Sequence, residues 1–512
     1  MEKTLKVKKF AGIEVPPGLT RVNFFFLFFN TFLIGMFMSI PTVIQPAFMN
    51  DIIRIEPGFA GSINSFLQNM SQIATLLFVA VIGALSDKTG RKILIFMGFA
   101  VLAVSFYCFS AASAIAQGLG ISPEFAASVC AYLSFIPGRA AEFEAFAPGL
   151  LVAYAMRFFV GIGLILAFPQ FITMVGDYTT DKDRGKGMAI NGMAMGFSSI
   201  LVFGIFGIIL SKAGVIAGIY TAVTLAVIAA ILTALFMKDH MPEKPKKKEG
   251  LRDVIPVVKQ SKALKAAYVS SLITRADMVV LGTFLIAWGV KAAPELGIEA
   301  GKATGRATLP LIIMGVVSLL AYPVIGIMLD KKGRMFTIII SMFIASAGLL
   351  LFALAPNPFH PLCFIGAVFA GIGMSGSIAG TNTLAIDAAP ITMMGAIMGG
   401  MNTMQPVGIL FFLALGGLLF DKVSPEAAFA FKGIATLLLA LWLFMIKDGV
   451  TREIKPVFTM QWEDAARSQM MRIPGGVRQG AIEGTESYAR EKALTVITVD
   501  LCKELKKMMD EG

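Results

Sequence analysis

The sequence predicts an all-α membrane protein whose twelve transmembrane helices form two pseudo-symmetric six-helix bundles. Three observations predict this fold: the chain is very apolar, its apolar residues gather in long stretches, and one short motif recurs in both halves. Of the 512 residues, 56% are hydrophobic and only 15% are charged. A soluble protein cannot bury that much apolar surface, so the composition favours a membrane protein.

Twelve apolar stretches account for this composition, and each is close to or longer than the ~20 residues that a spanning helix needs. They lie near 22–46, 62–86, 93–113, 149–176, 187–211, 214–237, 267–290, 308–329, 336–355, 362–386, 394–420 and 424–446. The residue-by-residue alternation of an outer-membrane barrel is absent. The first stretch is long enough to remain as a helix, so we expect no cleavable signal peptide.

One further segment, Phe125–Pro137, is apolar but short. A thirteenth span at this position would move every later basic loop to the other side of the membrane. We therefore predict that it lies at the outer surface of the bilayer.

The basic residues predict the orientation of the chain. With the N-terminus in the cytoplasm, 34 of the 44 Lys and Arg residues fall on the cytoplasmic side, eight fall outside, and Arg157 and Arg275 lie inside helices. This asymmetry predicts a multi-pass protein of the cytoplasmic (inner) membrane with both termini in the cytoplasm. It also explains the net charge of +11 through contact with anionic headgroups, without a nucleic-acid partner.

Two patterns recur in the two halves of the chain. The loops after the second and eighth stretches both carry Gly-x3-Asp-x2-Gly-Arg, formed by Gly83, Asp87, Gly90 and Arg91, and by Gly326, Asp330, Gly333 and Arg334. A Gly-Ile-Gly triplet also precedes Asp177 and Asp387 at the same distance. Gly83 and Gly326 are expected to let helices approach closely, and Gly90 and Gly333 to permit a tight turn.

The repeats predict two bundles that run the same way through the membrane, as parallel repeats about an axis along its normal. The predicted organisation is a cytoplasmic arm, a first bundle, a cytoplasmic central loop, a second bundle and a cytoplasmic tail. These cover residues 1–21, 22–237, 238–266, 267–447 and 448–512 respectively.

The first motif closely resembles the signature of the major facilitator superfamily, Gly-x-Leu-x-Asp-Arg-x-Gly-Arg-Arg/Lys. Here it is formed by Gly83, Leu85, Asp87, Lys88, Gly90, Arg91 and Lys92, with Lys88 in place of the family's Arg. The resemblance covers about residues 20–447. It implies a transporter that moves a small solute by alternating access between its two bundles.

The resemblance also implies a cytoplasmic gate. Arg91 would pair with Asp177, Arg334 would pair with Asp387, and Asp87 would meet the cytoplasmic end of the eleventh helix, whose N-terminus can stabilise an anion. These contacts would hold the cytoplasmic side shut in the outward-open state. The alternative is that the motifs serve only as topology signals.

Charged residues inside the spans are candidates for the transport path, because a charge at the bilayer centre costs at least ~2.5 kcal/mol. Arg157, Arg275 and Asp277 lie well inside helices. Arg275 and Asp277 are two residues apart, so we expect them to meet different partners. Arg157 is a candidate partner for Asp277 across the two bundles. Such a carboxylate is a candidate proton site, and a static buried pair is the alternative.

Neutral polar residues add to this path. The family's cavity is lined by helices one, four, seven and ten, which favours Asn30, Arg157, Asp277 and Asn382; Gln405 is a further candidate. For each amide, hydrogen bonding between helices is the alternative to contact with a solute. The two arginines favour an anionic solute such as an organic acid.

Other functions remain as alternatives. A transport-inactive sensor or scaffold could keep the same fold. Within the transporter class, drug or metabolite efflux is the alternative. Multidrug efflux is less favoured, because the pattern Gly-Pro-x-x-Gly-Gly of the family's proton-drug antiporters is absent from helix five, which has Gly192 and Gly196 without that proline. The scattered Cys and His residues predict no metal site, no cofactor and no enzyme chemistry. We expect a monomer with a small-molecule substrate, membrane lipid and protons as its candidate partners.

The tail lacks a span. Apolar residues recur at three- and four-residue spacing from Leu494 through Ile497, Leu501 and Leu505 to Met508, which predicts a short amphipathic helix. That helix would rest on the transporter or bind a partner. The alternative is a mobile, solvated tail.

Overall fold

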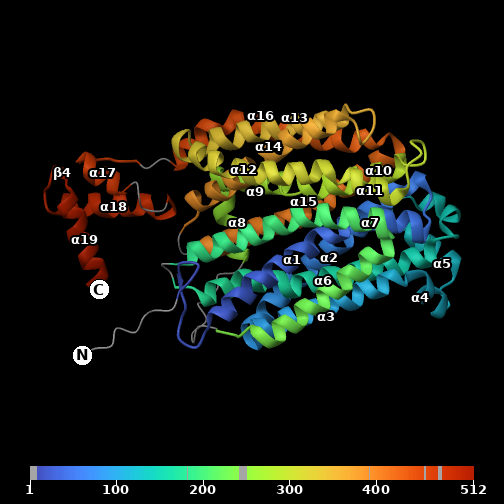
Figure 1. The fold of residues 1–512 in the computed structure, drawn as a ribbon. Helices are drawn as coiled ribbons and strands as arrows, with labels where there is room; N and C mark the ends of the chain where they lie inside the picture. Colours follow the sequence, from blue (N-terminus) through green and yellow to red (C-terminus); the bar gives the residue numbers. More distant parts are fainter. Residues whose placement is uncertain are drawn as a thin grey trace.

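The computed structural model describes residues 9–180, 183–240, 251–390, 393–454, 457–470 and 475–511. Nearly all of them lie in long helices that form two stacked bundles, one from each half of the chain (Figure 1). A small unit from the C-terminal residues lies beyond one end of the bundles.

The first bundle contains five long helices. They are α1 (Arg21–Phe48), α2 (Ala60–Thr89), α3 (Arg91–Ser110), α6 (Ala147–Tyr178) and α7 (Arg184–Phe236). Helix α1 begins with a capping box, in which the side chains and backbone amides of Thr20 and Asn23 satisfy each other. Helix α7 comprises two spans, because Gly214 has a φ of 82° and breaks the helical path.

The second bundle follows the short helix α8 (Leu251–Gln260). Its first span is interrupted at Arg275 and Ala276, which separate two helices. The helices are α9 (Lys262–Thr274), α10 (Asp277–Ala292), α11 (Ala300–Ala307), α12 (Leu309–Lys331), α13 (Arg334–Ala353), α14 (Pro361–Ala388), α15 (Met394–Lys422) and α16 (Pro425–Ile454).

The predicted fold class is confirmed. Eleven helical segments of the described residues are long and apolar enough to cross a membrane, and one of them, Lys186–Phe236, is 51 residues long. At 1.5 Å per residue that segment exceeds twice the thickness of a bilayer core, so its two parts on either side of Gly214 give twelve crossings.

The segment Phe125–Pro137 does not form a thirteenth span. Helix α5 (Pro123–Leu133) has 11 residues and packs against α6. It lies with α4 (Ala112–Gly118) at the end of the molecule opposite the C-terminal unit (Figure 1).

The bundles meet differently at the two ends of the molecule. We call the end that carries Gly90 and Gly333 the motif end, and the end that carries Gly61 and Asp421 the far end. At the far end the bundles pack tightly: a Cβ on Gly61 would lie 2.7 Å from the carbonyl oxygen of Gly417, and a Cβ on Gly301 would lie 2.5 Å from that of Leu210.

Toward the motif end the bundles separate. The face of α2 that carries Gly61 continues to Gly83, and the face of α15 that carries Gly417 continues to Gly399. A Cβ added to Gly83 or Gly399 would meet no atom within 4 Å. The seam between the bundles is therefore closed at the far end and opens toward the motif end.

Parts of the predicted arm and central loop are structured. Strands β1 (Lys9–Phe10) and β2 (Ile13–Glu14) form an antiparallel hairpin. The Glu14 amide donates to Asp183 at 2.9 Å, which ties the hairpin to the bundle. The seventh span begins at Lys262, before the predicted position 267, and the last span continues to Ile454, past the predicted position 447.

The described residues of the tail form a packed unit with a core of its own and do not extend as a solvated chain. Strands β3 (Gln461–Trp462) and β4 (Val496–Ile497) pair in parallel, with α17 (Asp464–Met470), α18 (Gly475–Glu491) and α19 (Val499–Glu511) around them. The predicted amphipathic helix begins only at Val499, because Leu494 lies in a loop and Ile497 in β4. The core comprises Trp462, Ala466, Met470, Ile482, Ala489, Ile497, Leu501 and Cys502.

Candidate functional site

A buried ion pair lies at the break in the seventh span. Asp277 is the first residue of α10, and its carboxylate pairs with the ammonium of Lys432 on α16. Both side chains are fully buried, with 0% exposure. The Lys432 ammonium also donates to the carbonyl oxygen of Ile273 at 2.9 Å and lies 4.4 Å from the ring centre of Phe412. The lysine therefore satisfies polar groups that the break would otherwise leave unpaired in the membrane.

This pair corrects two expectations. The partner of Asp277 is Lys432, and the predicted pair between Arg157 and Asp277 is wrong. The count of eight basic residues in outer loops includes Lys432. The structure instead places Lys432 inside a span, on α16. A lysine within the apolar stretch 424–446 was the signal that could have identified it.

Arg275 lies half-buried at the same break, with neutral partners. Its guanidinium donates to the side-chain oxygens of Asn382 on α14 and Asn402 on α15. The expectation that Arg275 and Asp277 meet different partners is confirmed. Gln405, also a predicted path residue, lies half-buried on α15.

Arg157 occupies the corresponding interior of the first bundle. Its guanidinium donates to Gln68 and Ser71 of α2, and it is 4% exposed. The Gln68 amide in turn donates to the Thr42 hydroxyl of α1 at 2.7 Å. Thr42 touches the second bundle, since a Cβ on Gly282 would lie 2.9 Å from its methyl group. This polar chain thus connects the Arg157 guanidinium to the seam.

Neither arginine has an acidic partner among the described residues. The Nε atom of Arg157 is buried without any hydrogen-bond partner there. Burying a charge without a counter-charge is costly. Each bundle therefore holds one positive charge that an anion would stabilise.

Asn30 does not join this group. Its side-chain amide donates to the Thr233 hydroxyl at 3.2 Å and contacts the Met237 sulfur at 3.3 Å. Both partners belong to the first bundle, and Asn30 is fully buried between α1 and the end of α7. For this residue the structure favours the alternative of hydrogen bonding between helices.

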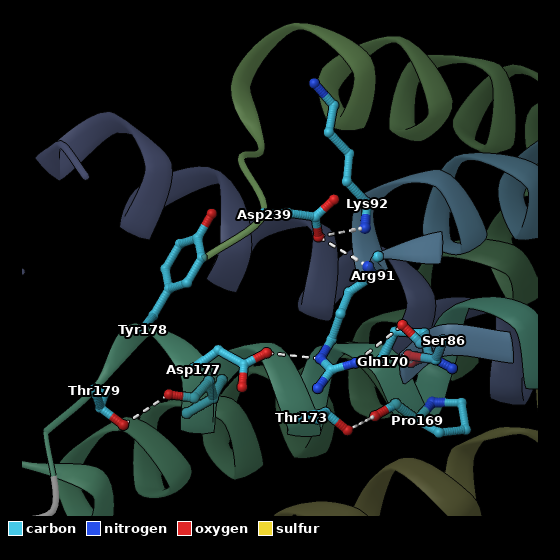
Figure 2. Close-up of polar contacts among 12 residues, drawn as sticks. Ser86, Arg91, Lys92, Pro169, Gln170, Thr173, Asp177, Tyr178, Thr179 and Asp239 are labelled. Atoms are coloured by element: carbon cyan, nitrogen blue, oxygen red, sulfur yellow. Dashed lines mark hydrogen bonds and ion pairs between the residues drawn. The ribbon is translucent and has the colours of Figure 1, made fainter. Parts of the chain in front are cut away.

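The predicted gate residues form a polar cluster at the motif end of each bundle. Figure 2 shows the first: the Arg91 Nε lies 2.6 Å from an Asp177 carboxylate oxygen, and its Nη1 donates to the Ser86 hydroxyl at 2.9 Å. The Asp239 carboxylate accepts the backbone amides of Arg91 and Lys92 at 2.8 and 2.9 Å.

The second cluster repeats this arrangement in part. The Arg334 Nε lies 2.9 Å from Asp387, and its Nη1 lies 3.4 Å from Asp330. Gly90 and Gly333 have φ values of 92° and 89°, so the predicted tight turns are confirmed.

Two expectations about the gate need correction. Each arginine–aspartate pair lies within one bundle, so these pairs cannot by themselves hold the bundles together. Gly83 and Gly326 do not mark close approaches, because a Cβ on either would meet no atom within 4 Å. The predicted contact of Asp87 with the eleventh helix lies outside the described residues, since only the backbone of Asp87 is described.

A charged contact that crosses the seam lies at the far end. Asp421, near the end of α15, accepts the backbone amides of Gly61 and Ser62 at 2.7 Å each, and the Ser62 hydroxyl as well. The carboxylate thus lies at the N-terminus of α2, where the helix dipole favours an anion. We call Gly61, Ser62, Gly417 and Asp421 the far-end latch.

This geometry, with two like-oriented bundles and charged groups beside their seam, is that of a multi-pass membrane protein with a transporter fold. The family model of the major facilitator superfamily matches residues 27–298 and 279–497, and the chain belongs to that superfamily.

Two relatives come from Paramagnetospirillum magneticum. The chain is 27% identical to the magnetosome protein MamH over 418 residues, which is 82% of this chain and 91% of MamH. It is 25% identical to the magnetosome protein MamZ over 443 residues, which is 84% of this chain and 64% of MamZ. The chain thus spans less than two thirds of MamZ.

Solved transporters share the fold. A variant of the nucleoside transporter NupG superposes with a TM-score of 0.64 at 12% identity, over 83% of this chain and 99% of that one. A POT family transporter in complex with 5-aminolevulinic acid gives 0.63 at 15% identity, over 87% and 98%. At such identities the likeness shows the fold alone.

Proposed function

We propose that this protein is a secondary active transporter that carries a small anionic solute by alternating access, with protons as the coupling ion. The observation that carries the proposal is the half-buried Arg275 guanidinium at the break in the seventh span. Its partners, Asn382 and Asn402, are neutral. An anion entering from the open motif end would therefore meet a positive charge already held in place.

The conformation supports alternating access. The bundles meet at the far-end latch and separate toward the motif end, as expected of one of the two end states. By the distribution of basic residues the motif end faces the cytoplasm, so this state would be inward-open. The predicted location is the inner membrane, with both termini in the cytoplasm.

A ligand screen tests the anion. Purified protein is heated with a panel of carboxylates, inorganic oxyanions, neutral sugars and cationic amines. We expect at least one anion to raise the melting temperature, because a ligand that binds only the folded state stabilises it. Arg275→Gln should lose this shift, and Arg139→Gln should keep it, because Arg139 is an exposed far-end residue paired with Glu142. Stabilisation by neutral or cationic solutes alone would reject the anion.

A flux assay tests transport and coupling. In proteoliposomes, the stabilising anion should exchange across the membrane and should accumulate when a pH gradient is imposed. Asp277→Asn should retain exchange and lose gradient-driven accumulation if the Asp277–Lys432 pair handles the proton. Accumulation by Asp277→Asn would favour the static pair, and absence of any flux in the wild type would favour the sensor or scaffold.

The relatives suggest a second possible location. MamH and MamZ are magnetosome proteins, and the chain matches MamH over most of both lengths. A magnetosome membrane is therefore a further candidate setting for the same transport activity. Fractionation of the native cells with a tagged chain would separate the two locations.

A further inference from the structure

The seam changes from closed to open part of the way along α2. The change is visible on the face of this helix that carries Gly61. There Ser65 and Asn69 are buried, whereas Ala80, about three turns beyond Asn69, is exposed.

Helix α10 changes at the same depth. Each of its residues from Val280 to Val290 is buried, whereas Val279, one residue nearer the motif end, is half-buried. The depths match because Thr42 of α1 lies between the two helices. Its hydroxyl accepts from Gln68 of α2, and its methyl group faces Gly282 of α10. The closed part of the seam therefore ends at the level of Gln68.

Asn69 makes a hydrogen bond across the seam at this level. Its side-chain nitrogen donates to the carbonyl oxygen of Leu410 on α15 at 3.3 Å. One turn nearer the far end, a Cβ on Gly417 would lie 2.4 Å from the Ser65 hydroxyl, so the helices are in close contact there. Among the described residues, the bond from Asn69 is the last one between α2 and α15 on the way to the motif end.

An asparagine is a costly residue for a permanent seal. Asn69 is 3% exposed, and its Oδ1 atom is buried without any hydrogen-bond partner in the part of the chain that the structure describes. An unpaired buried oxygen destabilises the state that buries it, and a leucine of similar size would avoid that cost. The oxygen gains water or solute as a partner when the seam opens at this level. Asn69 is thus matched to a position that is buried in one end state and wet in the other.

We propose that Asn69 is the gate residue that closes the solute path at mid-depth. Arg275 lies five residues before Val280, which is about 7.5 Å along a helix, so an anion held by Arg275 rests on the closed part of the seam. For the solute to pass, the hydrogen bond between Asn69 and Leu410 breaks and the Asn69 amide becomes accessible from the far end. This inference rests on the proposed transport function and adds the position of its gate.

Cysteine labelling of the full-length protein in detergent micelles tests the gate without requiring transport. Single cysteines are placed on α15 on the two sides of the hydrogen bond, as Thr403→Cys toward the motif end and Leu413→Cys toward the far end. Thr403 is half-buried and Leu413 is fully buried. The background is Cys108→Ser, because the other three native cysteines are buried. A polar maleimide should label Thr403→Cys and leave Leu413→Cys unreacted.

Two aspartate substitutions on α2 then separate the gate from general stability. Asn69→Asp keeps the side-chain shape but places a charge against a carbonyl oxygen, so it should open the gate and label Leu413→Cys at least about tenfold faster. Asn64→Asp is the matched control, because Asn64 is an equally buried amide whose partners, Gln45 and Ala60, belong to the first bundle. It should lower stability without exposing Leu413→Cys.

Two labelling results would overturn the proposal. One is equal labelling of Leu413→Cys in the two aspartate variants, which would make Asn69 an ordinary structural amide. The other is labelling of Leu413→Cys as fast as Thr403→Cys with Asn69 intact, which would place the end of the open path elsewhere.

Asn69→Leu connects the gate to transport. It removes the unpaired oxygen and should hold the gate shut, so it should keep the melting-temperature shift given by the anion and slow anion exchange about tenfold. Exchange at the wild-type rate would count against the gate. If the labelling pattern is as expected and the wild type exchanges no anion, the gate stands and the proposed transport fails.

Discussion

Replacing Lys432 by methionine should destabilise the protein more than any exposed lysine substitution. Methionine fills a similar volume but leaves the Asp277 carboxylate buried without its partner. Removing one partner of a fully buried pair costs about 3–5 kcal/mol. Loss of the hydrogen bond to the Ile273 carbonyl adds about 1 kcal/mol. We therefore expect a loss of roughly 4–6 kcal/mol in the free energy of unfolding.

The double variant Asp277→Asn/Lys432→Met separates the ion pair from the packing. Asparagine is neutral, so the double variant holds no unpaired charge and should recover part of the loss. A coupling energy of about 2–3 kcal/mol is expected from the double-mutant cycle.

The assay is reversible unfolding in mixed micelles with increasing dodecyl sulfate, followed by circular dichroism. Lys422→Met, at an exposed position near the end of α15, is the control and should change stability by no more than about 0.5 kcal/mol. If Lys432→Met behaved like this control, or showed no coupling to Asp277→Asn, the buried pair would not exist as described.

Three further predictions concern other parts of the chain. Asp421→Asn removes the charge from the far-end latch and should open the far end, measured as longer spin-label distances across it by pulsed electron resonance. Asp87→Asn, at the motif end of α2, should leave the far end closed or close it further. Gly408→Ala should destabilise the second bundle in the same micelle assay, because its Cβ would lie 1.8 Å from the Leu272 carbonyl oxygen. Burial would raise the pKa of Glu486, but hydrogen bonds from Thr459, Trp462 and two backbone amides outweigh burial and hold that pKa below its ordinary value. Its contribution to tail stability is thus present above the ordinary glutamate pKa and is lost as pH falls through the lowered one, so Glu486→Gln should flatten the acid limb of tail unfolding, followed by protease sensitivity.

The spans and the repeat were predictable because they depend on local sequence. A membrane helix must be apolar over about 20 residues, and a tight turn between helices needs glycine at positive φ. Both requirements are visible without knowing which helices touch. The paired motifs at Gly90 and Gly333 therefore located equivalent loops correctly.

The partners of buried charges were not predictable in the same way. Asp277 pairs with Lys432, more than 150 residues away, because α10 and α16 pack together in the second bundle. Sequence alone does not show which faces of two apolar helices meet. Asn30 illustrates the same limit: its helix was expected to line the path, but its side chain points to α7.

The structured tail also depended on long-range contacts. Glu486 is a charged residue in a polar helix, which suggests a solvated surface. Its side chain is instead buried. It accepts hydrogen bonds from Thr459 and Trp462, which lie more than 20 positions earlier. The parallel pairing of Gln461–Trp462 with Val496–Ile497 brings these segments together, and two-residue strands leave almost no periodic signal.

The far-end latch suggests how the two ends of the seam are related. Helices α2 and α15 pack against each other across the seam, and each begins at the end where the other finishes. At the far end, Asp421 of α15 caps the first turn of α2. At the motif end, Asp87 lies three residues before Gly90, close to the end of α2, and by the family resemblance it meets the start of α15. Each helix would then carry an acid for the N-terminus of its partner. If the two bundles rock as proposed, opening one end would close the other, and one set of charged hydrogen bonds would replace the other. This exchange would keep the two end states close in free energy. The arginine–aspartate pairs within each bundle would stay intact throughout, since they connect helices that move together.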